Sequence, residues 1–254
     1  MKFHNLRRMA IVGAGAAAMA LAPMASATVV GTLATSASIG GGVTVTPDTI
    51  TWNVGKDGTD FSVNTGTNLT YDGGTPVAIG DEGMLKDLVR PPASPPTILP
   101  LDAFMTINGT PVDFVLDGFT PPSPTNGTAC SSLASGQTCV VDGTSPFLLQ
   151  ATSGTGTGGL GTEVTLTVFG TVTDGTSPDS NWIGSFSETV SNLSPGQIQA
   201  MFTGPGASTA AITTGHTGNF TAIVANTVPE PSTAFLGLSG LLMAAGLVRR
   251  RRRA

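Results

Sequence analysis

The chain has 254 residues, of which 40% are hydrophobic, only 11% are charged and 6% are aromatic. Its 34 glycines show no three-residue period, which excludes a collagen helix, and its apolar content is high enough for a packed core rather than a disordered chain. The 38 threonines and the excess of glycine favour strands and turns over a helical bundle.

The first 27 residues have the pattern of a secretory signal peptide. A positively charged start is followed by a run of small apolar residues at 9–24, and small residues at Ala25 and Ala27 occupy the positions that a signal peptidase reads. We therefore expect export by the Sec machinery and cleavage after Ala27. An uncleaved membrane anchor is the alternative interpretation of the same segment.

Alternation of apolar and polar residues predicts a series of short strands. In 49–54, for example, Ile50, Trp52 and Val54 are expected to share one face. Asn108-Gly109 predicts a hairpin between two of the strands. The predicted strands, in chain order, are 43–46, 49–54, 61–65, 68–71, 105–107, 112–116, 138–141, 147–152, 163–173, 182–190 and 219–225.

One helix is predicted, over 194–202. Ser194 is suited to cap its amino terminus and Pro195 to occupy its first position, where the missing backbone N–H costs nothing.

These elements predict an all-β fold for residues 28–228. We expect a single antiparallel β-sandwich of the jelly-roll or immunoglobulin-like kind. The proline-rich segments 91–100 and 120–124 and the Gly/Thr-rich segment 153–161 are interpreted as long surface loops. Two small β-domains remain the alternative.

The segment 28–228 is strongly acidic. It holds fifteen acidic and three basic residues, so its net charge is −12, whereas the whole chain carries −5. Such a surface repels the phosphate backbone, which excludes nucleic acid as a partner. Cys130 and Cys139 are the only cysteines, and in an oxidising compartment we expect them to form a disulfide.

Hard oxygen ligands make calcium the only metal that the composition favours. Asp57, Asp60 and Asp179 are the candidate ligands, in two short clusters that do not match the regular 12-residue calcium loop. Turn formation and solubility are the simpler interpretation of these and the other carboxylates. No other cofactor is expected.

Three aromatic residues, Trp52, Trp182 and Tyr71, are candidates for a sugar-stacking platform. Each lies in a predicted strand whose alternation instead favours packing in the core. His216 is the only histidine outside the leader, and its Gly-rich surroundings predict an exposed turn. Because no nucleophile motif accompanies it, no catalytic residue is assigned and no enzyme activity is expected.

The carboxy-terminal segment combines three features. Pro229-Glu230-Pro231 precedes an uncharged stretch at 232–248 that predicts a short transmembrane helix. A basic cluster that should stay in the cytoplasm follows it. This cluster consists of Arg249, Arg250, Arg251, Arg252 and Arg253. Triplet, helix and basic tail together resemble the PEP-CTERM sorting signal, over residues 229–254.

The resemblance implies processing near the triplet by exosortase, in a Gram-negative bacterium that makes extracellular polysaccharide. The chain would be anchored in the inner membrane by its C-terminal helix only before processing, and then released to the cell surface or matrix. We therefore expect a non-enzymatic protein with a structural or adhesive role in a polysaccharide matrix or biofilm. An extracellular carbohydrate-binding module or glycan hydrolase is the alternative.

Overall fold

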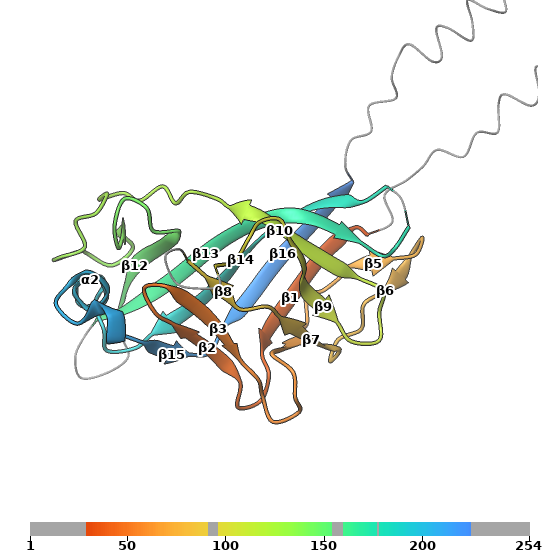
Figure 1. Cartoon of the computed structure of the whole chain (residues 1–254), viewed down its shortest axis with the longest axis horizontal. Helices are drawn as coiled ribbons and strands as arrows, with labels where there is room; N and C mark the ends of the chain where they lie inside the picture. The colour runs from red at the N-terminus through yellow and green to blue at the C-terminus, as the bar shows by residue number, and fades with distance from the viewer. Residues whose placement is uncertain (1–28, 91–95, 154–159, 177, 225–254) are drawn as a thin grey trace, which may run out of the picture. The chain divides into compact units, whose positions relative to one another are not determined.

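The computed structural model describes residues 29–90, 96–153, 160–176 and 178–224, all within one compact unit, Met1–Val224. Strands account for about half of the described residues and helices for few of them (Figure 1). The predicted all-β class is therefore confirmed. The predicted signal peptide (1–27), with Ala25 and Ala27, and the sorting signal (229–254) lie outside the described residues.

Eight strands pair side by side into a closed ring, and every pair of neighbours is antiparallel. Closure comes from β10 and β13, where Phe114 lies opposite Val172 and Leu116 opposite Gly170. In ring order the strands are β10 (Asp113–Phe119), β9 (Leu101–Ile107), β7 (Glu82–Leu85), β4 (Phe61–Val63), β1 (Gly31–Ala37), β16 (Thr217–Val224), β14 (Ser180–Val190) and β13 (Leu160–Thr173).

The prediction of a single β-sandwich is wrong for this sheet, which is a barrel. Alternation places apolar residues on one face of each strand in a sandwich and in a barrel alike, so it does not distinguish the two folds. The difference lies in the pairing of β10 with β13, whose residues are more than 40 positions apart in the chain.

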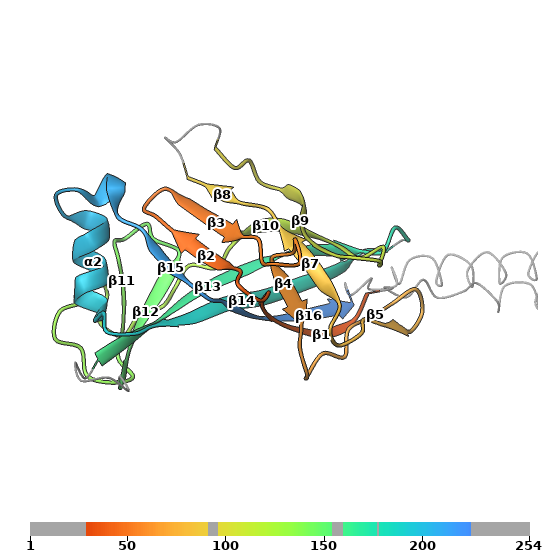
Figure 2. The ribbon, with the colours of Figure 1, turned by 90° about the horizontal axis from the view of Figure 1, so that it is seen from below.

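The barrel occupies only part of the two longest strands. The first half of β13 pairs instead with β12 (Phe147–Ser153), which carries β11 (Thr138–Val140) at its outer edge. A second sheet lies over this extension as a separate layer (Figure 2). Its strands are β15 (Ile212–Thr214), β2 (Gly42–Val45), β3 (Thr49–Asn53) and β8 (Leu88–Val89).

The remaining elements are short. A small hairpin pairs β5 (Thr70–Tyr71) with β6 (Thr75–Pro76), and the 3-10 helix η2 covers Ala207–Thr209. The helix α2 (Pro195–Thr203) lies beside β12 at one end of the extension (Figure 1). It begins as predicted, because the Ser194 hydroxyl accepts from the Gln197 backbone and the Gln197 side chain accepts from the Ser194 N–H.

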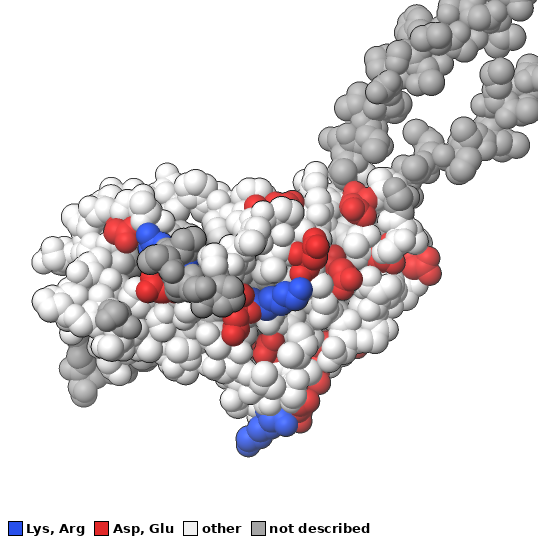
Figure 3. Space-filling model, in the orientation of Figure 1, with Lys and Arg blue, Asp and Glu red and all other residues white. Residues whose placement is uncertain are grey.

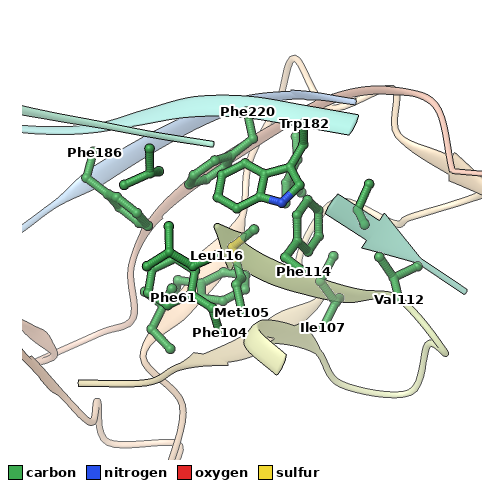
Figure 4. Close-up of a cluster of buried hydrophobic side chains, with 14 of the residues drawn as sticks. Phe61, Phe104, Met105, Ile107, Val112, Phe114, Leu116, Trp182, Phe186 and Phe220 are labelled. Atoms are coloured by element: carbon green, nitrogen blue, oxygen red, sulfur yellow. The ribbon is translucent and has the colours of Figure 1, made fainter. Parts of the chain in front are cut away.

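Aromatic side chains fill the barrel (Figure 4). The Trp182 ring centroid lies 5.5 Å from that of Phe114, 5.8 Å from that of Phe220 and 6.5 Å from that of Phe104. The Phe114 and Phe220 rings meet Trp182 edge to face, an arrangement that adds to the free energy gained from burial alone. Trp182 is therefore the centre of the barrel core.

Trp182 also joins the strands at the point of closure. Its indole Nε1–H donates to the Val115 carbonyl of β10 (3.0 Å) and to the Thr171 carbonyl of β13 (2.9 Å). Gly170 lies directly opposite Trp182 on β13, and a Cβ there would overlap the Val115 carbonyl oxygen. Glycine is required at this position because the β10 backbone and the indole occupy the space of a side chain.

The strand predictions hold best where alternation is strong. In β13, Leu166, Val168 and Val172 are buried as expected, and β9 and β10 form the predicted hairpin. Val54 is exposed, contrary to prediction, because β3 ends at Asn53. The strands β1, β6, β7, β8 and β15 were not predicted, since they are short or, like β1, rich in small and hydroxyl residues.

We expect Gly170→Ala to lower the free energy of unfolding by about 2 to 3 kcal/mol, because the new methyl group would separate β10 from β13. Denaturant unfolding of the full chain measures this change. Thr171→Val, which alters the next residue of β13, is the matched control and should change the free energy by less than about 0.5 kcal/mol. Equal stability of the two variants would contradict this account of closure.

Candidate functional site

An apolar cavity of about 60 Å³ lies between the second sheet and the extension of the large sheet. Val43 and Trp52 line it from the second sheet, Leu149 and Phe186 from the large sheet, and Ile198 from α2. The buried apolar residues that the structure describes form two separate clusters, and the lining includes members of both. The cavity therefore lies where the hydrophobic core is interrupted.

His216 lines this cavity between β15 and β16. Its ring centroid lies 5.0 Å from that of Trp52 and 6.1 Å from that of Phe186. The residue is only 3% exposed, so the predicted exposed turn is wrong. The flanking glycines indicated a turn, but they carry no information about the Trp52 and Phe186 rings that pack over the imidazole.

The burial of His216 determines whether its imidazole carries a charge. Among the described residues, neither ring nitrogen has a hydrogen-bond partner. Burial away from water lowers the pKa of His216 from 6.5 to about 4, so the imidazole is neutral at pH 7. The other polar residues of the lining are Ser187, Glu188 and Thr214, all only partly buried.

A groove of about 620 Å³ adjoins the cavity. The two hollows share four lining residues, Ile50, Val141, Phe147 and Phe202. The groove therefore lies directly beside the cavity and is lined by more polar residues.

Three side chains form a polar relay in this groove. Arg90 Nη2 donates to the Thr144 hydroxyl (2.9 Å), which donates to Asp142 Oδ1 (2.7 Å). The Thr144 hydroxyl is the main cause of a lowered pKa at Asp142, and the charge of Arg90 adds to it. Sequence reasoning missed this group, because Arg90 and Asp142 lie 52 residues apart and neither belongs to a motif.

The three candidate sugar-contact residues do not form a platform. Trp182 is 2% exposed in the barrel core, and Trp52 is 5% exposed with its Nε1–H donating to the Lys86 carbonyl. Tyr71 is half-buried in the small hairpin. The structure thus brings neither tryptophan to the surface, in line with the core packing that alternation favoured.

The three candidate calcium ligands are placed differently from one another. Asp57 and Asp179 are exposed, whereas Asp60 is 1% exposed and accepts from the Leu85 N–H (2.7 Å). Burial raises the pKa of Asp60. Within the described ranges no group of three or more His, Cys, Asp or Glu side chains could hold a metal ion, so these aspartates do not gather into a site.

The predicted disulfide between Cys130 and Cys139 is present, with an S–S distance of 2.04 Å. Both cysteines are buried in the cluster that also contains Leu149 and Ile198. The bond therefore links the loop before β11, at Cys130, to β11 itself, at Cys139, in the part of the core beside α2.

The pH dependence of stability should report the burial of His216. The pKa of His216 is about 4 in the folded protein and 6.5 in the unfolded chain, so protonation favours the unfolded chain. The free energy of unfolding is therefore highest above pH 6.5, as far as His216 is concerned, and falls as the pH drops towards 4. We expect a loss of about 3 kcal/mol in the free energy of unfolding over this window. Denaturant titrations at several pH values measure it.

His216→Phe is the control, since it keeps an aromatic ring beside Trp52 and Phe186 but cannot titrate. The difference in stability between wild type and variant should shift by about 3 kcal/mol between pH 6.5 and 4. A difference that is constant with pH would show that His216 titrates normally in the folded state.

No helix in the described part of the chain is long and apolar enough to cross a membrane. The predicted transmembrane stretch, 232–248, and the arginine cluster, 249–253, lie outside that part. No curated protein and no solved structure matches the chain significantly.

A family model described as the PEP-CTERM protein-sorting motif matches residues 227–253. This match agrees with the resemblance predicted for 229–254 and includes the Pro229-Glu230-Pro231 triplet. It implies exosortase as the processing partner, and export with sorting to the cell surface. The chain therefore carries a PEP-CTERM protein-sorting motif over residues 227–253.

Proposed function

We propose that this protein is a non-enzymatic component of the cell surface or extracellular polysaccharide matrix, with a structural or adhesive role. The observation that carries the proposal is the PEP-CTERM motif at residues 227–253. In this proposal the Sec machinery and a signal peptidase act on residues 1–27, and exosortase acts on the other end of the chain. A Gram-negative host with a polysaccharide matrix or biofilm is part of the same proposal.

The position of the motif supports release of an intact folded unit. The last barrel strand, β16, ends at Val224, and the triplet begins five residues later at Pro229. Cleavage near the triplet would therefore remove no residue of the described fold. In this proposal the stretch 232–248 anchors the chain in the inner membrane until that cleavage.

The surface of the described unit supports a role outside the cell. Its fifteen acidic residues against three basic ones keep a released protein soluble through mutual repulsion. On the face drawn in Figure 3 the acidic side chains are spread over several places rather than gathered in one patch. The disulfide between Cys130 and Cys139 suits an oxidising compartment.

Carbohydrate binding in the groove is the second candidate function. Arg90, Thr144 and Asp142 present donors and acceptors at a hollow of about 620 Å³, which is the kind of surface that hydroxyl-rich ligands need. A glycan-array screen of wild type against Arg90→Ala tests this candidate. Binding that is lost in the variant would support it, and no binding by wild type would exclude it on that array.

Replacement of Pro229-Glu230-Pro231 by three alanines should prevent processing and release, because the extended, helix-breaking triplet would be lost. We expect the variant to stay in the inner membrane with a mass that includes all five arginines. Wild type recovered from the surface or medium should have a mass that ends near Val228 to Pro231. Intact-mass spectrometry of both fractions measures this.

Pro205→Ala, which changes an exposed proline outside the motif, is the matched control and should be processed like wild type. Recovery of wild type only from the inner membrane, with Arg249–Arg253 intact, would overturn the proposal of release.

A further inference from the structure

A hollow interrupts the hydrophobic core of this protein. One cluster of core residues includes Trp52 and Phe186, a second includes Leu149 and Ile198, and the cavity between the two sheets is lined by all four. Protein interiors are normally packed without such gaps. A small molecule that filled the cavity would restore the contacts that the two clusters lack.

His216 supplies a second, independent observation. Its side chain is 97% buried and lines the cavity, and neither of its ring nitrogens has a hydrogen-bond partner among the described residues. Buried polar groups are nearly always paired, because an unpaired one loses its bonds to water without replacement. A molecule that occupied the cavity would supply the missing partner.

The charges of the lining exclude an anionic ligand. The described residues that line the cavity include no lysine or arginine, and their only carboxylate is Glu188. An anionic group would meet repulsion there and find no cation, and any buried charge without a partner is costly. An anion is therefore excluded, and the mainly apolar lining favours a neutral ligand.

The chemistry of the imidazole selects the polar group of the ligand. A neutral imidazole offers one donor and one acceptor, and which nitrogen carries the hydrogen depends on the tautomer. A hydroxyl group can donate or accept, so it suits whichever nitrogen faces the cavity. A carbonyl or ether oxygen can only accept, so it suits only the nitrogen that carries the hydrogen.

We propose that this cavity binds a neutral, mainly aliphatic molecule whose hydroxyl group forms a hydrogen bond with His216. A volume of about 60 Å³ holds roughly four to six water-sized groups at ~10–15 Å³ each. The proposal is independent of sorting, because the cavity lies wholly outside residues 227–253.

The test compares 1-butanol, which is small enough for the cavity, with 1-chlorobutane, a molecule of similar shape that cannot donate a hydrogen bond. The full chain carries His4→Gln, so that His216 is its only histidine. At pH 7 we expect 1-butanol to bind about five-fold more tightly than 1-chlorobutane, and to shift the ¹⁵N resonances of the imidazole. Titrations followed by nuclear magnetic resonance give both readouts.

Two variants locate the site. His216→Phe keeps an aromatic wall but removes both nitrogens, so the two ligands should bind it equally. Val164→Phe introduces a larger side chain from a partly exposed position of the lining and should weaken both ligands at least ten-fold. Thr167→Val, three residues along β13 and outside the lining, is the matched control and should bind as wild type does.

Three outcomes would overturn the proposal. Equal affinities of wild type for the two ligands would remove the role of His216. Tighter binding of butylamine than of 1-butanol would place the polar group at Glu188 instead. Failure of all these probes to bind, with the imidazole resonances unchanged, would mean that water alone fills the cavity.

Discussion

The bonds of one indole group join the three strands on which the barrel depends. Trp182 projects inward from β14, crosses the position of Gly170 on β13 and reaches the Val115 carbonyl of β10 as well as the Thr171 carbonyl. Because closure pairs β10 with β13, neither strand presents a free edge along this stretch. The same ring is the centre around which the phenylalanines of the barrel pack (Figure 4). The bonds that close the barrel and the packing of its core therefore meet at this residue.

The extension beyond the barrel follows from the length of β13. Its second half pairs with β10 and its first half with β12, so the sheet is closed at one end and open at the other. At the open end the inner face is covered by the second sheet and α2 (Figure 2). Trp52, Phe186 and His216 meet at the junction of the two regions. The cavity lies there because the barrel core and the cluster beside α2 pack on different neighbours.

Sorting and folding are encoded in separate parts of the chain. The PEP-CTERM motif is a linear signal over 227–253, which begins after the last strand has ended at Val224. Its features are composition and order: a triplet, an apolar stretch and a basic tail. Such a signal needs no tertiary partner. The hollows of the described unit, in contrast, depend on tertiary structure, because each is formed by residues distant in sequence. Arg90 and Asp142, which both line the groove, are one such pair.

The sequence by itself determined the features that depend on neighbours along the chain. The all-β class, the Ser194 cap, the Asn108-Gly109 hairpin, the cysteine pair and the sorting motif all belong to this group. Tertiary structure alone decided that the large sheet closes, since alternation is the same for either face-to-face or barrel packing. It also decided the burial of His216, because the rings that cover it come from β3 and β14. Local pattern reports which face of a strand is buried, whereas long-range pairing decides what buries it.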